Sequence, residues 1–344
     1  MTRSGPFSEV KAEAVTRENR PRIDVVVPVY NKLRFLPVAV GSIVAAAEAY
    51  GAAQIWLVDN GSTDGSYELL IDQFGDRATV LRLMSGTIAA VRNFGAKHGD
   101  ATCISFIDCD CVVPPDYFDR LAAVLAETGA EATGCTVVLP QNPTWVEAVW
   151  NRMHDDGGQG ARTWINSANF AVRRDIFERI GGFNETLQTD EDTEICFRIR
   201  RAGGTLISDR RLAVAHLDNA KTLPEFFRKE RWRAMGMFST VSVGSIDKAT
   251  VMMTAHIAAM AAAIAVLLLA HMDVGIRVLI AVALALMVPA ATVVYRRRSS
   301  VARFGVPSGV LLYELFYVAR INALLMVVVR AVRARNNADA SSSA

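Results

Sequence analysis

Short apolar runs alternate with longer helical stretches in the first part of the chain. The apolar runs predict buried strands at residues 23–29, 54–59, 78–84 and 102–108. The longer stretches predict helices at residues 33–50, 62–74, 87–98 and 114–128. Strands that are apolar throughout and alternate with helices are typical of a parallel sheet covered on both faces. The pattern therefore predicts an α/β fold.

Residues 131–220 follow a less regular pattern. They predict short strands at residues 133–139, 164–172, 205–208 and 212–216, and helices at residues 144–154, 174–180 and 191–202. Ligands of α/β sheets bind outside the carboxyl ends of the strands. Asp59 and Asp108 lie at two such predicted ends. We therefore expect both aspartates to face one crevice.

Apolar residues dominate the chain after residue 249. Residues 251–270 and 278–295 are each long enough to cross a hydrocarbon core of about 30 Å. Arginines follow the second run at residues 296–298, and short arginine-rich loops stay on the cytoplasmic side of a membrane. The two runs thus predict a transmembrane hairpin that returns the chain to the side from which it came.

A third apolar segment, residues 309–329, is interrupted by polar side chains, including Glu314 and Arg320. If it spanned the membrane, the arginines that follow it would lie outside, against the usual bias. A re-entrant or interfacial helix and a third span both stay open for this segment.

Basic and aromatic residues are interleaved between residues 223 and 238, which favours a helix on a membrane surface over a helix packed on the catalytic domain. The start of the chain is polar and does not resemble a signal peptide, so we expect a multi-pass protein of the inner (cytoplasmic) membrane with its catalytic domain in the cytoplasm. The predicted organisation is a flexible tail (1–22), a catalytic domain (23–220), an amphipathic interface region (221–247), a membrane region (248–335) and a disordered tail (336–344).

Composition narrows this picture only slightly. The 344 residues carry a formal net charge of +2, which gives no indication of a nucleic-acid partner. The mean hydropathy of +0.23 averages a polar first part and an apolar last part. The odd number of cysteines in so long a chain argues against a disulfide framework and for a reducing compartment.

The sequence Asp108-Cys109-Asp110 is the first candidate for chemistry. Two carboxylates one residue apart at the end of an apolar strand can hold Mg²⁺ or Mn²⁺ on a diphosphate, because these ions prefer oxygen ligands. A solvated turn is the alternative. The flanking cysteines lack a second pair, which disfavours zinc.

Four further features have both a functional and a structural interpretation. The turn Pro28-Val29-Tyr30-Asn31 and the later Asp59 offer places for a nucleotide base or ribose, although turn and capping chemistry also explains the residues after Asp59. Arg92 suits either a phosphate or a surface ion pair. Within the acidic residues 189–194, one carboxylate suits a general base, whereas carboxylates at a helix start also simply complement the helix dipole.

Together these motifs, in this order, resemble the inverting family 2 glycosyltransferases of the GT-A fold, over about residues 23–232. The features that carry the resemblance are Pro28-Val29-Tyr30-Asn31, Asp59-Asn60-Gly61-Ser62-Thr63-Asp64, Arg92-Asn93, Asp108-Cys109-Asp110, and Gly181-Gly182-Phe183 leading to Glu191-Asp192. The resemblance implies a Rossmann-like, mostly parallel mixed sheet with helices on both faces, followed here by transmembrane helices.

The resemblance also implies roles for individual residues. The nucleotide-sugar group would comprise Pro28, Tyr30, Asn31, Asp59, Arg92 and Asp108. Asp110 would hold the metal, and His216 would approach it as a histidine does in some relatives, although a histidine after a strand is often structural. Asp192 would act as the catalytic base. The acceptor side would comprise Gly182, Phe183, Glu191, Arg231 and Trp232.

Arg228-Lys229-Glu230-Arg231-Trp232 is similar to the Gln-x-x-Arg-Trp motif of processive members, but Arg228 replaces the glutamine, so processivity does not follow. The predicted activity is transfer of a sugar from a nucleotide-sugar donor, UDP-sugar by default, to a hydroxyl of a lipid-linked or membrane-proximal glycan acceptor. Such transfer would serve cell-envelope glycolipid or polysaccharide synthesis. The alternatives are a polyprenyl-phosphate glycosyltransferase and a non-catalytic sugar-nucleotide-binding membrane protein.

Overall fold

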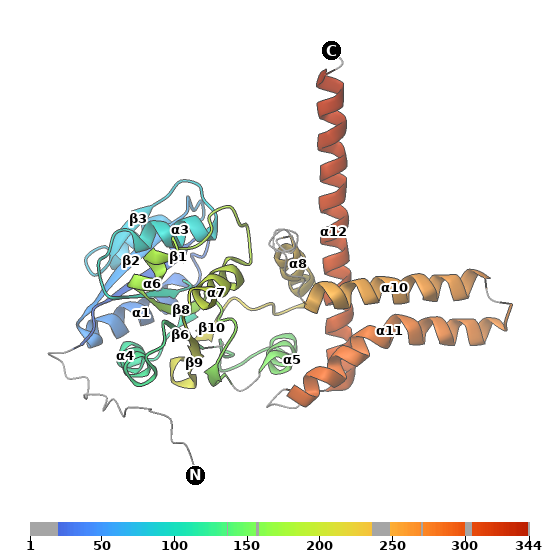
Figure 1. The fold of residues 1–344 in the computed structure, drawn as a ribbon, viewed down its shortest axis with the longest axis horizontal. Coiled ribbons are helices and arrows are strands. Elements are labelled where there is room, and N and C mark those ends of the chain that lie inside the picture. Colours follow the sequence, from blue (N-terminus) through green and yellow to red (C-terminus); the bar gives the residue numbers. More distant parts are fainter. Residues whose placement is uncertain are drawn as a thin grey trace, which may run out of the picture.

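The structure is a computed structural model, and it describes residues 20–135, 137–155, 158–235, 248–269, 271–299 and 305–342. A globular α/β part is followed by long helices at the carboxyl end of the chain (Figure 1). The predicted tail of residues 1–22 falls largely outside the described residues, which begin at residue 20.

The main sheet is mixed and has the strand order β3-β2-β1-β4-β8-β6-β9-β7 within the described residues. Its first four strands are parallel: β3 (Thr79–Arg82), β2 (Ala53–Asp59), β1 (Ile23–Val29) and β4 (Cys103–Ile107). The remaining strands are β8 (Asn169–Arg173), β6 (Ala132–Gly134), β9 (Leu206–Ser208) and β7 (Gly160–Ala161). Strand β8 runs antiparallel to both of its neighbours. The sheet thus confirms the predicted mixed, mostly parallel class.

Helices cover both faces of this sheet, as the apolar strands require. One face packs against α1 (Leu36–Tyr50), α2 (Ser66–Phe74) and α4 (Tyr117–Thr128). The other packs against α3 (Ile88–Ala96), α6 (Arg174–Arg179) and α7 (Glu191–Arg201). Every residue of β1 is buried, with Val25 facing the first core and Val26 the second. Burial on both faces explains why this strand is apolar apart from Asp24, whose buried carboxylate pairs with Arg174 at 2.7 Å.

The carboxyl ends of the parallel strands meet at one edge of the sheet. Val29 at the end of β1 is in register with Asp59 at the end of β2, and β4 ends just before Asp108. Beyond β4 the chain forms β5 (Cys111–Val112), which pairs antiparallel with β10 (Ala215–His216) in a small separate sheet. The turn after β4 is therefore tied to a segment about a hundred residues later in the chain.

Three helices in the described part of the chain are long and apolar enough to cross a membrane. They are α10 (Lys248–Leu269), α11 (Val274–Ser299) and α12 (Val306–Ser342), and the two predicted spans lie within the first two apart from residue 270. In Figure 1, α10 and α11 run side by side, and α12 crosses them near the α/β part. Helix α12 continues to Ser342, so residues 336–342, predicted as a disordered tail, are helical.

An aromatic cluster joins the catalytic part to the long helices. It lies between α5 (Trp145–His154), α8 (Leu223–Ala234) and α12. The ring of Trp150 is 4.7 Å from that of Phe226 and 5.5 Å from that of Tyr313, measured between centroids. Helix α8, predicted to lie on a membrane surface, thus packs its buried side on protein. Its predicted continuation to Phe238 lies outside the described residues.

Candidate active site

The loops after β1 and β2 are fastened to each other. The backbone N–H of Asn31 donates to Ser62 Oγ at 3.0 Å, and Asn31 Oδ1 accepts from the backbone of Thr63 at 2.8 Å. Asn31 has a φ of 50°, a left-handed conformation that asparagine tolerates better than most residues. Among the predicted nucleotide residues here, Pro28 is buried and Asn31 serves this clamp, whereas Tyr30 is 56% exposed and offers its ring for contact.

Asp59 has its acceptors occupied within the protein. Its carboxylate accepts the backbone N–H groups of Gly61 and Ser62, at 3.0 and 3.1 Å, and pairs with Arg82 Nε at 3.2 Å. The side chain is fully buried. In this structure the aspartate shapes the turn after β2, in agreement with the turn chemistry that the sequence allowed, and its contact with a base or ribose stays a prediction.

Arg92 is the centre of a buried carboxylate network. Its side chain is 2% exposed, and its two terminal nitrogens bind different acids, Asp108 Oδ1 at 2.8 Å and Glu191 Oε1 at 2.6 Å. Ser167 Oγ donates to the same oxygen of Glu191 at 3.0 Å. Arg92 thus joins the end of β4 to the start of α7 and is not the surface ion pair that the sequence left open. Both terminal nitrogens are already engaged, so a phosphate would have to compete for them.

Asn93, the neighbour of Arg92, fixes the glycine loop before α7. Its Oδ1 accepts the backbone N–H of Phe183 at 2.9 Å, and its Nδ2 donates to the Phe183 carbonyl at 2.9 Å. Phe183 itself is buried against Phe106, with ring centroids 5.1 Å apart. The structure therefore gives Phe183 a packing role, its predicted acceptor contact stays a prediction, and Gly182 permits the close approach of Asn93.

Asp192 lies beside Glu191 in the first turn of α7. Its Oδ1 accepts the backbone N–H of Thr193 at 2.7 Å, and its Oδ2 lies 3.5 Å from the backbone nitrogen of Ser167. Burial and the adjacent Glu191 charge raise the pKa of Asp192 to about 7. A carboxyl group with that pKa can accept a proton near neutral pH and release it again. Arg92, Asp108, Glu191 and Asp192 are thus brought together as one group.

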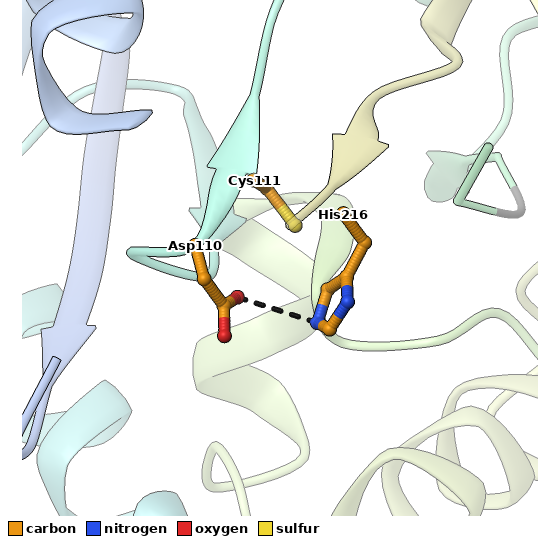
Figure 2. A group of neighbouring side chains, drawn as sticks. All are labelled: Asp110, Cys111 and His216. Atoms are coloured by element: carbon orange, nitrogen blue, oxygen red, sulfur yellow. Dashed lines mark ion pairs between the residues drawn. The ribbon is translucent and has the colours of Figure 1, made fainter. Parts of the chain in front are cut away.

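Asp110 forms a second group with His216, shown in Figure 2. Asp110 Oδ1 lies 3.3 Å from His216 Nε2, because β5 and β10 pair at this point and the backbone of Leu217 donates to the Asp110 carbonyl. His216 Nδ1 lies 3.1 Å from Asn219 Oδ1, whose amide nitrogen donates to the His216 carbonyl at 2.8 Å. In that amide orientation Nδ1 can donate to Asn219, and Nε2 would then be the ring nitrogen available to a cation.

These residues fit a divalent cation. Asp110 is 3% exposed, and its Oδ1 is buried without a hydrogen-bond partner. A carboxylate oxygen and an imidazole lone pair that face each other repel unless a proton or a cation lies between them. An oxygen and a nitrogen ligand, with a partner that orients the imidazole, are chemically suited to Mn²⁺ or Mg²⁺.

The nearby cysteines are not suited to a soft metal. Cys111 lies close to both Asp110 and His216 (Figure 2), but burial and the carboxylates Asp108 and Asp110 raise the pKa of its thiol well above the ordinary value. Burial does the same for the pKa of Cys109, and both cysteines are free. A neutral thiol is a poorer metal ligand than a thiolate, and the preference of this site for a hard cation stays a prediction.

Two predicted acceptor-side residues lie on α8, and two residues that join the Asp110 group were not predicted. Arg231 and the 60% exposed Trp232 lie in the last turns of α8, the helix that packs on α12. Lys32 and Asp218, by contrast, join the Asp110 group through ion pairs of 2.6 Å. Lys32 directly follows the recognised Asn31, but a single charged residue gives no pattern from which its partner could be deduced.

The mixed sheet, the carboxylates at its strand ends and the apolar helices define a GT-A-type protein with a candidate membrane segment. The sequence profile described as "Glycosyl transferase family 2" matches residues 24–202, more than half of the chain. The chain belongs to this family.

Individual relatives agree with this assignment. The chain is 26% identical to glycosyltransferase AglE of Haloferax volcanii over 195 residues, which are 54% of this chain and 64% of that protein. It is 26% identical to succinoglycan biosynthesis protein ExoA of Rhizobium meliloti over 192 residues, 51% of this chain and 57% of that protein. It is 34% identical to the undecaprenyl-phosphate 4-deoxy-4-formamido-L-arabinose transferase of Salmonella paratyphi A over 119 residues, 33% of this chain and 36% of that protein. The chain thus spans less than two thirds of the length of each of these relatives.

A solved structure extends the likeness to the whole fold. The mannosyltransferase PcManGT from Pyrobaculum calidifontis, in complex with GDP-Man and Mn²⁺, is 18% identical, with a TM-score of 0.55 over 90% of this chain and 87% of that one. At that identity the likeness shows the fold alone.

Proposed function

We propose that this protein is an inverting, metal-dependent glycosyltransferase that moves a sugar from a nucleotide-sugar donor to a hydroxyl of a lipid-linked or membrane-proximal glycan. The observation that carries the proposal is the environment of Asp192. This carboxyl group is half-buried beside the buried Glu191 in the group organised by Arg92, and its pKa is raised to about 7. UDP is the default nucleotide, from the family resemblance.

In the proposed reaction Asp192 removes the proton from the acceptor hydroxyl. The acceptor oxygen then forms a bond to the anomeric carbon, and the bond from that carbon to the phosphate oxygen breaks. The leaving nucleoside diphosphate keeps the electron pair, and one displacement inverts the anomeric centre. Arg92 holds Asp108 and Glu191 in place, so the groups around the reacting atoms need little rearrangement.

Asp110 and His216 would hold the divalent cation, with Asp110 Oδ1 as the oxygen ligand. When bound there, such a cation neutralises the charge that develops on the departing diphosphate. Tyr30, exposed directly after β1, would stack on the base of the donor.

Phosphate acceptors provide a second candidate function. The relative from Salmonella paratyphi A that is 34% identical over 119 residues is named as an undecaprenyl-phosphate transferase. A phosphate monoester is already ionised near neutral pH and needs no base. In a polyprenyl-phosphate glycosyltransferase, Asp192 would therefore be dispensable.

The membrane attachment is proposed to place the catalytic part on the cytoplasmic side of the inner membrane. Helices α10 and α11 would cross it as a hairpin, and α12, which crosses their ends in Figure 1, would lie along the cytoplasmic surface. Cysteines introduced at Ser308 and Ser341, near the two ends of α12, would then react with an impermeant maleimide only from the cytoplasmic side. Labelling of the two from opposite sides would instead establish a third span.

The decisive experiment compares Asp192→Asn with Asp175→Asn in purified full-length protein supplied with nucleotide sugars and membrane lipid acceptors. Asp175 is a matched control because its side chain is 63% exposed and pairs only with the exposed Arg173 among the described residues. We expect Asp192→Asn to lower the transfer rate by about 10²–10⁴-fold and Asp175→Asn to leave it unchanged.

The other outcomes distinguish the alternatives. Full activity of Asp192→Asn, with mass spectrometry detecting a polyprenyl-phosphate sugar, would identify the second candidate. If the wild-type protein transferred no sugar and bound no nucleotide in the presence of Mn²⁺, the enzymatic proposal would be wrong and a binding role would replace it. Lipid and polysaccharide profiles of cells that lack the protein would identify the acceptor.

A further inference from the structure

Lys32 occupies a position between two carboxylates. Its ammonium nitrogen lies 2.6 Å from Asp110 Oδ2 and 2.6 Å from Asp218 Oδ2. The three residues come from different parts of the chain: the loop after β1, the turn after β4 and the segment after β10. One side chain thus joins the carboxylate at the candidate cation site to a second acid that the proposed mechanism does not use.

Asp218 is surrounded by positive charge. Besides Lys32, its Oδ1 lies 2.9 Å from Lys229 Nζ and 3.2 Å from a terminal nitrogen of Arg34. Asp110 has fewer positive neighbours. Among the described residues Lys32 is its only lysine or arginine partner, and its Oδ1 lacks a hydrogen bond. If Lys32 left, Asp218 would keep two cations, whereas Asp110 would need a replacement.

The backbone of Lys32 is fixed, whereas its side chain is held by ion pairs at its ammonium group. Its N–H donates to Ser66 Oγ at 3.1 Å, and the next residue, Leu33, donates to Asp64 Oδ2 at 3.0 Å. The side chain is 28% exposed. A lysine side chain is a compact charge on a flexible stem, so it can move between acidic partners without a change of fold.

We propose that Lys32 is an exchangeable resident cation: its ammonium neutralises Asp110 in the metal-free protein, and moves to the donor diphosphate when a divalent cation binds Asp110 and His216. This inference rests on the proposed function. The ammonium lies beside the carboxylate that the cation needs, so the two compete for Asp110. The displaced ammonium remains near the incoming diphosphate, where a second positive charge stabilises the leaving group.

Metal binding without any donor tests the competition. Binding of Mn²⁺ to full-length protein in detergent is measured by electron paramagnetic resonance for the wild type, Lys32→Met and Lys229→Met. We expect Lys32→Met to tighten Mn²⁺ binding roughly tenfold or more, because a positive charge beside the ligand is removed. Lys229→Met removes the same charge from Asp218, and Lys229 forms no ion pair with Asp110 among the described residues, so this variant should change the affinity far less.

A second variant, Lys32→Gln, keeps the test informative if Lys32→Met misfolds. Lys32→Gln keeps a hydrogen-bond donor between the two acids and should also tighten Mn²⁺ binding. Unchanged or weaker Mn²⁺ binding by both Lys32 variants, or no binding by any of the proteins, would overturn the proposal. So would an equal tightening by Lys229→Met, because the effect would then come from net charge alone.

The second half of the proposal concerns the diphosphate. At saturating Mn²⁺, the affinity for UDP or GDP, whichever the wild type binds, should fall roughly tenfold in Lys32→Met. Unchanged affinity would show that the ammonium does not move to the diphosphate. These measurements require no sugar transfer, so their failure is distinguishable from failure of the proposed function, which the Asp192→Asn comparison tests separately.

Discussion

Asp108 and Asp110 are two residues apart, yet they are held in different ways. Asp108 pairs with the buried guanidinium of Arg92, which also binds Glu191. Asp110 pairs with the ammonium of Lys32, and its other oxygen faces His216. A guanidinium is planar and holds two acids in a fixed geometry, whereas an ammonium is a point charge that can be exchanged. The site thus has a permanent frame, made of Arg92, Asp108 and Glu191, beside the cation position at Asp110 that we propose to be exchangeable.

Replacing Arg92, the permanent cation, should produce the largest loss of stability and of transfer activity. Arg92→Met would leave Asp108 and Glu191 as buried or half-buried charges without their shared partner. Breaking a buried ion pair from one side costs about 3–5 kcal/mol, so we expect a loss of unfolding free energy of that size and loss of transfer. Arg92→Lys should recover only part of it, because one ammonium does not reproduce a guanidinium that binds two acids. Thermal and denaturant unfolding of the purified protein measure both.

Arg173→Met is the control for this prediction. Arg173 is also paired with an aspartate, Asp175, but both side chains are more than half exposed. Its replacement should change the unfolding free energy by less than about 1 kcal/mol. Equal losses in the Arg92 and Arg173 variants would contradict the idea that burial of the Arg92 network makes it a frame.

The glycine loop extends the frame and provides a smaller, sharper test. Gly181 and Gly182 both have positive φ, of 80° and 70°, so alanine is strained at either position. Only at Gly182 would a Cβ atom collide, at 2.6 Å from Asn93 Oδ1, whereas at Gly181 it meets nothing within 4 Å. We expect Gly181→Ala to cost about 1 kcal/mol and Gly182→Ala about 2–3 kcal/mol. Equal losses of unfolding free energy in the two variants would show that Asn93 can move aside for the added Cβ atom.

The strands that carry the site could be predicted where their sequence is long and strongly apolar. The bounds predicted for β1, residues 23–29, are those observed, because a strand buried on both faces is apolar at almost every position, with Asp24 as the exception here. Strands β5 and β10 went unrecognised as a pair, since strands of two residues have no periodicity. The strand predicted at residues 133–139 was too long, as β6 ends at Gly134.

The contacts between motifs could not be predicted from the sequence. Arg92 and Glu191 are 99 positions apart, and neither has a pattern that identifies its partner. Arginine in such a motif is equally compatible with phosphate binding, and only tertiary packing decides that two acids engage it. Phe183 is similar: its sequence position suggests an acceptor contact, but burial against Phe106 and Phe177 gives it a place in the core.

A substitution of Asp192 should have a modest, pH-dependent effect on stability that separates its chemical role from its role in folding. Its pKa is raised from an ordinary 3.8 to about 7, so between these values the folded protein keeps a proton that the unfolded chain has lost. The unfolding free energy contributed by this group therefore falls as the pH rises from about 4 to 7.

An asparagine at this position carries no such charge, so we expect Asp192→Asn to be more stable than the wild type at pH 8, by on the order of 1–2 kcal/mol, and to lose most of this advantage at about pH 5. Thermal unfolding at the two pH values measures the difference. An inactive variant that gains stability at pH 8 would mean that the protein maintains a costly buried charge for its chemistry, whereas a difference independent of pH would contradict the raised pKa.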